Sequence, residues 1–263
     1  MISQNKSKKL SRESVIQWNE LIELIMTNNG GIASLNFLYE QAPKYKELPS
    51  SDWQKTLRGV LYREVNRGKL KKVGLSVYAL RDYEDNNSAY SYVLTSKPID
   101  SYMKNIKDYH STIEGMLVEI GNFLEYKTFT SDFNKKFDGK DLKELSAITK
   151  IPDFTYSEIM NVVSKSDVIW FSNTKHLFPK YIFEVESTTD FSNSMLKMYQ
   201  LLNFEAKFML VASSKREGIF LDRLNREPFA KERLKFTFRS FEDVVRLYFS
   251  SVEHYELKSK FLS

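Results

Sequence analysis

Two neighbouring apolar runs in the second half of the chain carry acidic residues, and they constrain the fold more than any other feature. The run at 167–171 (DVIWF) opens with Asp167, and the run at 181–187 (YIFEVES) holds Glu184 and Glu186. Their length and apolar content predict two buried strands. Because strand side chains alternate between faces, Glu184 and Glu186 are expected on the same face. Burying carboxylates among apolar residues is costly, which indicates that they have a use.

The surrounding sequence predicts a mixed α/β (α+β) fold. A helix with an apolar stripe is expected at 109–126, and the two acidic strands follow it after a long excursion. After them we expect a helix at 193–206, a strand at 207–213, and a C-terminal remainder of short helices around a strand at 234–238. The order is that of a central sheet flanked by helices.

Composition excludes several classes of protein. The 263 residues contain no cysteine, which excludes a disulfide framework, a thiolate zinc site and a cysteine nucleophile. No apolar run approaches the length of a membrane span, so no membrane association is expected. The polar start of the chain has no signal-peptide pattern, and the simplest expected location is cytoplasmic.

Positive charge is concentrated at the N-terminal end. Residues 1–83 hold 14 Lys and Arg against 8 Asp and Glu, whereas the remaining residues hold 25 against 26. The chain length favours two domains. A basic module beside a near-neutral one indicates a polyanion-binding domain joined to a second activity, although a lysine-rich surface without a partner has the same signature.

The basic module, residues 1–83, resembles a winged helix-turn-helix domain. Helices are expected at 14–27, 33–41 and 53–66, with the second closed by Pro43. A hairpin turning at Gly74 is expected after them. In such domains the third helix enters the major groove and the hairpin lies along the backbone. Candidate DNA contacts, against the alternative of a solvated or protein-binding face, are Lys55, Arg58, Arg63, Arg67, Lys69, Lys71 and Lys72.

A polar stretch at 84–105, with no sustained period, is expected to be a linker to a second domain at 106–263. In that second domain, two adjacent strands can bring Asp167, Glu184 and Glu186 together around one divalent cation. Mg²⁺ prefers hard oxygen ligands, and bound Mg²⁺ can activate water and offset charge on a phosphate.

The second domain also resembles the PD-(D/E)XK, or restriction-endonuclease-like, nuclease superfamily. The resemblance rests on D-V-I-W-F, F-E-V-E-S-T-T-D, L-x-E-I-G on the first helix, then S-M-L-K-M, V-A-S-S-K-R and R-E-P-F, over about residues 109–250. It implies a mixed sheet flanked by helices, following the winged helix domain that residues 1–83 resemble. It also implies an Mg²⁺-dependent phosphodiesterase, resembling type II restriction endonucleases, that acts on double-stranded DNA.

Carried over residue by residue, the resemblance makes Asp167 and Glu184 metal ligands, for one or two ions. Glu186 stands where the superfamily usually has lysine, and a glutamate there orients or deprotonates the attacking water. Glu119 on the first helix completes the cluster, with Glu114 as the fallback and an ordinary surface acid as the alternative. Lys197 is either a relocated cation that reaches the phosphate or part of a plain surface helix.

Two functions from different classes follow. The first is a DNA endonuclease, expected to be a homodimer because two strands must be cut. The second is a non-catalytic DNA-binding regulator or sensor whose nuclease-like domain serves dimerisation. The three histidines flank no second ligand in sequence, and His110 is expected at the surface or facing the linker.

Overall fold

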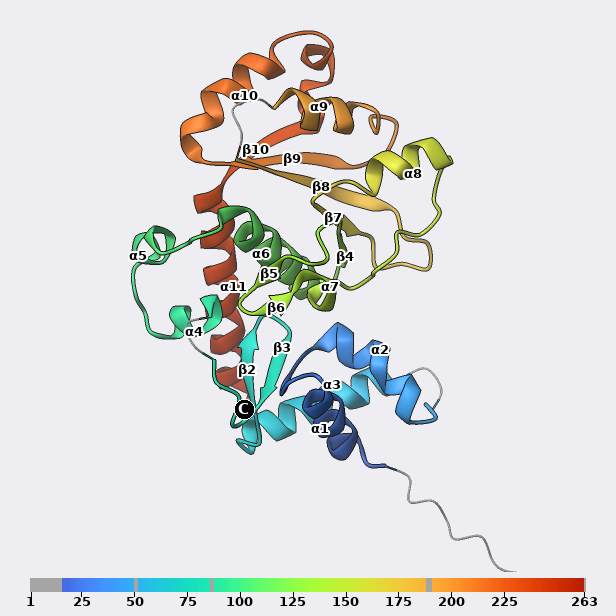
Figure 1. Ribbon diagram of the computed structural model, residues 1–263, viewed down its shortest axis with the longest axis vertical. Helices are drawn as coiled ribbons and strands as arrows, with labels where there is room; N and C mark the ends of the chain where they lie inside the picture. The colour runs from blue at the N-terminus through green and yellow to red at the C-terminus, as the bar shows by residue number, and fades with distance from the viewer. Residues whose placement is uncertain (1–15, 50–51, 86–87, 188–190, 263) are drawn as a thin grey trace, which may run out of the picture.

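The computed structural model describes residues 16–49, 52–85, 88–187 and 191–262 (Figure 1). As predicted, a mixed five-stranded sheet is flanked by helices. The strand order is β10-β9-β8-β7-β4, with β8, β9 and β10 parallel and β7 and β4 antiparallel to their neighbours. The strands are β4 (Lys127–Thr130), β7 (Val168–Phe171), β8 (Pro179–Glu186), β9 (Lys207–Ala212) and β10 (Phe236–Ser240).

Helices cover both faces of this sheet. One face packs on α6 (Tyr109–Phe123) and α11 (Phe241–Leu262), and the other on α9 (Ser192–Tyr199) and α10 (Glu217–Leu224). Side chains of β7 alternate between the two cores, with Trp170 in the first and Ile169 in the second. Burial on both faces explains why these strands read as nearly continuous apolar runs.

The long helix α11 is a correction to the sequence analysis, which expected only short helices around the strand at 234–238. Residues Val245, Tyr248 and Val252 follow helical spacing and are completely buried against the rest of the core. The last two turns are mostly exposed, with Leu257 68% and Phe261 88% exposed, so the buried stripe covers only part of the helix. In Figure 1, α11 runs from the central sheet down to the N-terminal module.

The N-terminal module contains three helices and a three-stranded antiparallel sheet of order β1-β3-β2. Its helices fall near their predicted positions, although residues 14–15 of the first lie outside the described part. The elements are α1 (Trp18–Asn28), β1 (Ile32–Ser34), α2 (Leu35–Tyr45), α3 (Trp53–Asn66), β2 (Leu70–Gly74) and β3 (Val77–Leu80).

Two details of this module differ from prediction. Strand β1 was not expected, because three residues are too few to show a period; it forms by pairing with β3. Helix α2 continues past Pro43 to Tyr45 instead of closing there. Pro43 lies in the last turn and has no N–H to donate to the carbonyl of Tyr39, and the buried Leu38 and Ala42 hold the helix in place despite this local cost.

The stretch at 84–105 is not an extended linker. It forms α4 (Ala89–Leu94) and α5 (Ile99–Lys104), and both pack on α11. Tyr90 is 1% exposed, and the ring of Tyr102 lies 5.3 Å from that of Phe249. These short helices are stabilised by contact with α11, which lies more than 130 residues away in sequence. No local sequence pattern therefore predicts them.

The hairpin of the N-terminal module is docked on the second domain. Val73, Leu75 and Val77 belong to the same buried cluster as α6 and α11. The smaller elements that complete the second domain are β5 (Lys136–Phe137), β6 (Lys140–Asp141), α7 (Leu142–Leu145), α8 (Ser157–Val163), η1 (Ser214–Arg216) and η2 (Phe229–Lys235). A shared core fixes the module against the central sheet.

Candidate active site

The register of β7 and β8 brings the two predicted metal ligands together. Val168 pairs with Phe183, so Asp167, just before β7, comes opposite Glu184. Asp167 Oδ2 accepts a 2.6 Å hydrogen bond from the backbone N–H of Val185. This bond fixes the carboxylate beside the C-terminal end of β8.

Glu184 is 3% exposed and has a cation as its partner. Lys197 Nζ on α9 lies 2.6 Å from Glu184 Oε2 and also donates to the carbonyl of Lys165 at 2.8 Å. Lys197 therefore belongs to the cluster, as one of the two sequence readings proposed, and not to a plain surface helix. In this arrangement its charge offsets that of Glu184.

Glu186 lies on the same face of β8 as Glu184, as strand alternation predicted. Its carboxylate accepts a hydrogen bond from Ser194 on α9, one turn from Lys197. Its backbone carbonyl accepts a 2.8 Å bond from Arg216, whose guanidinium lies 4.4 Å from the ring centre of Phe191. The end of β8 is thus held from two sides.

Helix α6 adds two groups to this site. His110 Nδ1 is 3.2 Å from Glu114 Oε1, and His110 Nε2 is 3.8 Å from Asp167 Oδ2. One ligand atom from each of these three residues lies within 4.8 Å of the others. His110 was expected at the surface or facing the linker; its ring instead faces the acids of the site, with 26% of the side chain exposed. Its spacing of four residues from Glu114, which puts both on one helix face, was the available signal.

A loop before β5 closes the cluster with a second cation. Lys135 Nζ lies 2.7 Å from His110 Nδ1 and 3.5 Å from Glu114 Oε2, and it also pairs with Asp132. Neither Lys135 nor Asp132 was singled out from the sequence. Both lie in the irregular excursion between β4 and β7, where no periodic pattern exists to place them.

Glu119 is not part of the cluster, which corrects the sequence expectation. Its fully buried carboxylate accepts from the N–H of Leu75 at 2.7 Å and from the Tyr248 hydroxyl at 2.8 Å, and it lies 3.7 Å from Lys140 Nζ. Residues five apart on a helix project about 140° from each other, so Glu114 and Glu119 face different neighbours. Glu114, the fallback, is the acid that reaches Asp167.

Burial raises the pKa values of the clustered carboxyl groups. The pKa of Glu184 rises to about 8, first because it is buried and then because of the charge of Asp167. Burial likewise raises the pKa of Glu114 to about 7 and that of Asp167 above its ordinary value. The adjacent Glu114 raises the pKa of His110. Such mutual perturbation is typical of functional sites.

The donor set fits a divalent cation. Within the described part of the chain, Glu114 Oε1 and Glu184 Oε1 are buried and make no hydrogen bond. Buried carboxylate oxygens without partners are costly, and a cation would satisfy them. Asp167, Glu184 and Glu114 offer hard oxygen ligands of the kind that Mg²⁺ prefers.

Most of the predicted DNA contacts on α3 are exposed. Lys55, Arg63 and Arg67 face solvent, and Arg58 is half-buried. Lys55 pairs with Asp52 at 3.2 Å, and Glu64 holds both Arg67 at 2.8 Å and Lys69 at 3.7 Å. These pairs involve exposed ammonium and guanidinium groups, which stay accessible to a polyanion.

The two lysines of β2, Lys71 and Lys72, were also expected to contact DNA, and the structure places both against the rest of the protein. Lys71 Nζ donates to the carbonyl of Tyr83. Lys72 Nζ lies over the ring of Tyr255 on α11, and burial lowers the pKa of Lys72 to about 6. Docking of the hairpin on α11 turns Lys72 inward, so Lys72 does not face an external ligand in this structure.

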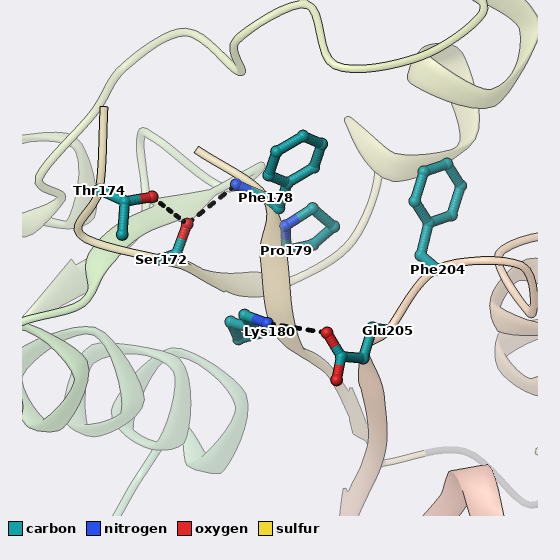
Figure 2. Close-up of a pocket in the computed structure, with 7 residues that line it drawn as sticks. All are labelled: Ser172, Thr174, Phe178, Pro179, Lys180, Phe204 and Glu205. Atoms are coloured by element: carbon teal, nitrogen blue, oxygen red, sulfur yellow. Dashed lines mark hydrogen bonds and ion pairs between the residues drawn. The ribbon is translucent and has the colours of Figure 1, made fainter. Parts of the chain in front are cut away.

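A pocket at the opposite end of β8 lacks this chemistry (Figure 2). It measures about 350 Å³, and Lys180 pairs there with Glu205 at 3.2 Å while Ser172 accepts from the N–H of Phe178. The pocket lies beside the start of β8, whereas Glu184 and Glu186 are at its end. The acidic cluster is therefore the better candidate site.

Comparison with known families gives the decisive observation. Residues 93–262 match the family described as type II restriction enzyme NmeDI C-terminal domain. The chain belongs to this family. The match begins inside α4 and includes the entire cluster of His110, Glu114, Asp167 and Glu184.

The expectation of a type II restriction endonuclease-like protein is thus confirmed at the level of the family. No curated protein and no solved structure matches the chain at a significant level. None of the described helices is both long and apolar enough to span a membrane.

Proposed function

We propose that the protein is an Mg²⁺-dependent endonuclease that hydrolyses phosphodiester bonds in double-stranded DNA. The observation that carries the proposal is the meeting of Asp167, Glu184 and Glu114 at one end of the sheet, with buried carboxylate oxygens that lack partners. Membership of a restriction-enzyme family supports it. The same arrangement supports a PD-(D/E)XK-type nuclease domain.

In this proposal Asp167, Glu184 and Glu114 hold the cation. When bound, Mg²⁺ would lower the pKa of a water molecule and offset negative charge on the scissile phosphate. Glu186, held by Ser194, orients or deprotonates the attacking water. Lys197 supplies positive charge to the site in place of the lysine that the superfamily has at the position of Glu186.

The N-terminal module selects the site on DNA. Its order of elements and its β1-β3-β2 sheet support a winged helix domain, in which the exposed face of α3 enters the major groove. Exposed Arg63 and Lys55 on that face suit base and phosphate contacts. Two copies of the chain, one for each strand, would act as a homodimer.

The test uses the full chain, with plasmid DNA in methylated and unmethylated forms and with or without Mg²⁺. We expect discrete fragments only when Mg²⁺ is present. Glu184→Ala should lower cleavage by about a hundredfold or more, because loss of groups that merely support a ligand already costs 10–100-fold. DNA binding by this variant should be unchanged or stronger, because a charge that repels phosphate is lost.

Glu205→Ala is the matched control, since Glu205 is an exposed acid at the other end of the sheet. It should cut like the parent protein. Undiminished cleavage by Glu184→Ala would overturn the proposed site. Retarded DNA bands without any cleavage by the parent protein would favour the non-catalytic regulator instead.

A further inference from the structure

We propose that His110 is a nitrogen ligand of the cation site, so that the site binds Mn²⁺ in preference to Mg²⁺. The inference rests on the proposed nuclease site and adds a ligand to it that oxygen chemistry alone does not provide. It concerns which cation the chain selects, and not whether the chain cuts DNA.

The geometry of His110 supports the inference. It lies in the first turn of α6, and its two ring nitrogens face the two acids of the cluster, Glu114 at 3.2 Å and Asp167 at 3.8 Å. Ligand atoms bound to one transition metal ion at about 2.0–2.2 Å lie at most about 4.4 Å apart. The three groups, which lie within 4.8 Å of one another, need only small side-chain movements to share one ion.

The burial of Glu114 is an independent indication of a ligand. This side chain is completely buried, and its Oε1 makes no hydrogen bond within the described residues although it faces the imidazole. The oxygen and the ring nitrogen form a 3.2 Å ion-pair contact but no aligned hydrogen bond, so Glu114 Oε1 keeps a lone pair that a shared cation would satisfy.

The identity of the donors sets the preference. Mg²⁺ takes oxygen ligands and retains several waters, whereas imidazole nitrogen suits transition metals. Among the transition metals, Mn²⁺ is the one that also suits carboxylate ligands, so a set of one nitrogen and two carboxylates favours Mn²⁺ over Mg²⁺. The half-buried imidazole, 26% exposed, leaves room for water on the open side.

Lys135 is the competitor of the cation. Its ammonium lies 2.7 Å from His110 Nδ1 and 3.5 Å from Glu114 Oε2, so it uses the Nδ1 lone pair and places a positive charge beside Glu114. A bound ion requires Lys135 to move off the imidazole. Removing its charge should therefore strengthen cation binding.

Calorimetric titration of the metal-free full chain with MnCl₂ and with MgCl₂, without DNA, tests the inference. We expect the parent protein to bind Mn²⁺ at least about tenfold more tightly than Mg²⁺. His110→Ala should weaken Mn²⁺ binding by about tenfold or more and Mg²⁺ binding by much less. His110→Gln, which fills similar space, should behave in the same way, and circular dichroism checks that both variants are folded.

Two further variants complete the test. His176→Ala removes an exposed histidine from the loop between β7 and β8 and should leave both affinities unchanged. Lys135→Met should tighten Mn²⁺ binding; weaker binding would overturn the assignment of this cluster as the cation site. Equal Mn²⁺ preference in folded His110→Ala and parent protein would overturn the role of His110 while leaving the nuclease proposal intact. Undiminished cleavage by Glu184→Ala would instead overturn the proposed nuclease site itself.

Discussion

Glu184 shows what burial does to a single carboxyl group. Its side chain is almost fully enclosed, it lies beside Asp167, and its pKa is raised from 4.5 to about 8. Lys197 offsets part of this effect but not all of it. Without a cation, the folded chain therefore keeps a proton on Glu184 at pH values where the unfolded chain has lost it.

The consequence is a measurable dependence of stability on pH. Between about pH 4.5 and 8 the folded protein binds more protons than the unfolded one, so its free energy of unfolding should fall as pH rises through this window. Glu184→Gln keeps the neutral shape and removes the titration. The free energy of unfolding is compared at pH 5 and pH 8 in the presence of a chelator. Its loss over this range should be smaller for Glu184→Gln than for the parent protein, by more than about 1 kcal/mol.

Urea unfolding at both pH values measures this difference. Glu205→Gln, at an exposed position, serves as the control and should follow the parent curve. If Glu184→Gln and the parent protein lose equal stability, Glu184 is not the buried titrating group that the geometry indicates.

At the scale of elements, α6 owes its position to two glycines. A Cβ atom at Gly121 would come 2.5 Å from both Thr128 Cγ2 and Trp170 Nε1, and one at Gly115 would come 2.2 Å from Phe137 Cβ. The helix therefore lies directly on β4, β7 and the loop at β5. This close approach is what carries His110 and Glu114 to Asp167 at the start of β7.

Gly121→Ala should destabilise the protein although alanine is the better helix former. The gain in helix propensity is about 1 kcal/mol. Overpacking against the buried Trp170, whose indole N–H donates to the carbonyl of Leu117, costs about 1–3 kcal/mol or more. We expect a net loss in thermal or urea unfolding. Gly59→Ala on α3, with open space around its Cβ, should instead be neutral or stabilising.

The exposed face of α3 leads to a separate prediction about DNA binding. Arg63→Ala removes an exposed guanidinium from the face proposed to enter the groove, and it should weaken binding by about 1–3 kcal/mol if Arg63 contacts a base. If Arg63 contacts a phosphate, the slope of log affinity against log salt concentration should become shallower by about one, because one counterion fewer is released on binding.

Fluorescence anisotropy with duplex DNA at several salt concentrations measures both quantities. Arg226→Ala is the matched control, because Arg226 is an exposed arginine paired with Asp222 outside the N-terminal module. An Arg63→Ala protein with unaltered affinity and salt slope would move DNA recognition away from α3.

At the scale of the whole molecule, Glu119 joins the two parts of the chain. Its carboxylate binds the N–H of Leu75 in the hairpin turn, the hydroxyl of Tyr248 on α11, and Lys140, which is 4% exposed. A Cβ at Gly74 would come within 2.8 Å of this carboxylate, so the hairpin backbone lies directly against it. Docking of the basic module depends on this buried contact.

Glu119→Ala should therefore cost about 3–5 kcal/mol of stability, since it leaves Lys140 buried without its counter-charge. Cleavage per folded molecule should be retained below the melting transition. Calorimetry and a cleavage assay at low temperature separate the two effects. Glu158→Ala, at an exposed position on α8, should change stability by less than about 0.5 kcal/mol. Full stability with lost cleavage would return Glu119 to the active site.

The strands of the site and the acids on them could be predicted from local sequence patterns. Alternation along β8 is a local property of extended backbone, so it was enough to put Glu184 and Glu186 on one face and to mark Asp167 at the start of the neighbouring strand. The helices at 53–66 and near 109–123 could also be predicted, because their apolar residues repeat at helical spacing.

Which other groups meet those acids depends on how the elements pack together. Glu114 and Glu119 look alike in sequence, and the packing of α6 turned one toward Asp167 and the other toward the hairpin. His110, Lys135 and the inward Lys72 were decided in the same way, as were α4 and α5 on α11. These placements depend on contacts between residues far apart in the chain, and no local period encodes the angle at which one element packs on another.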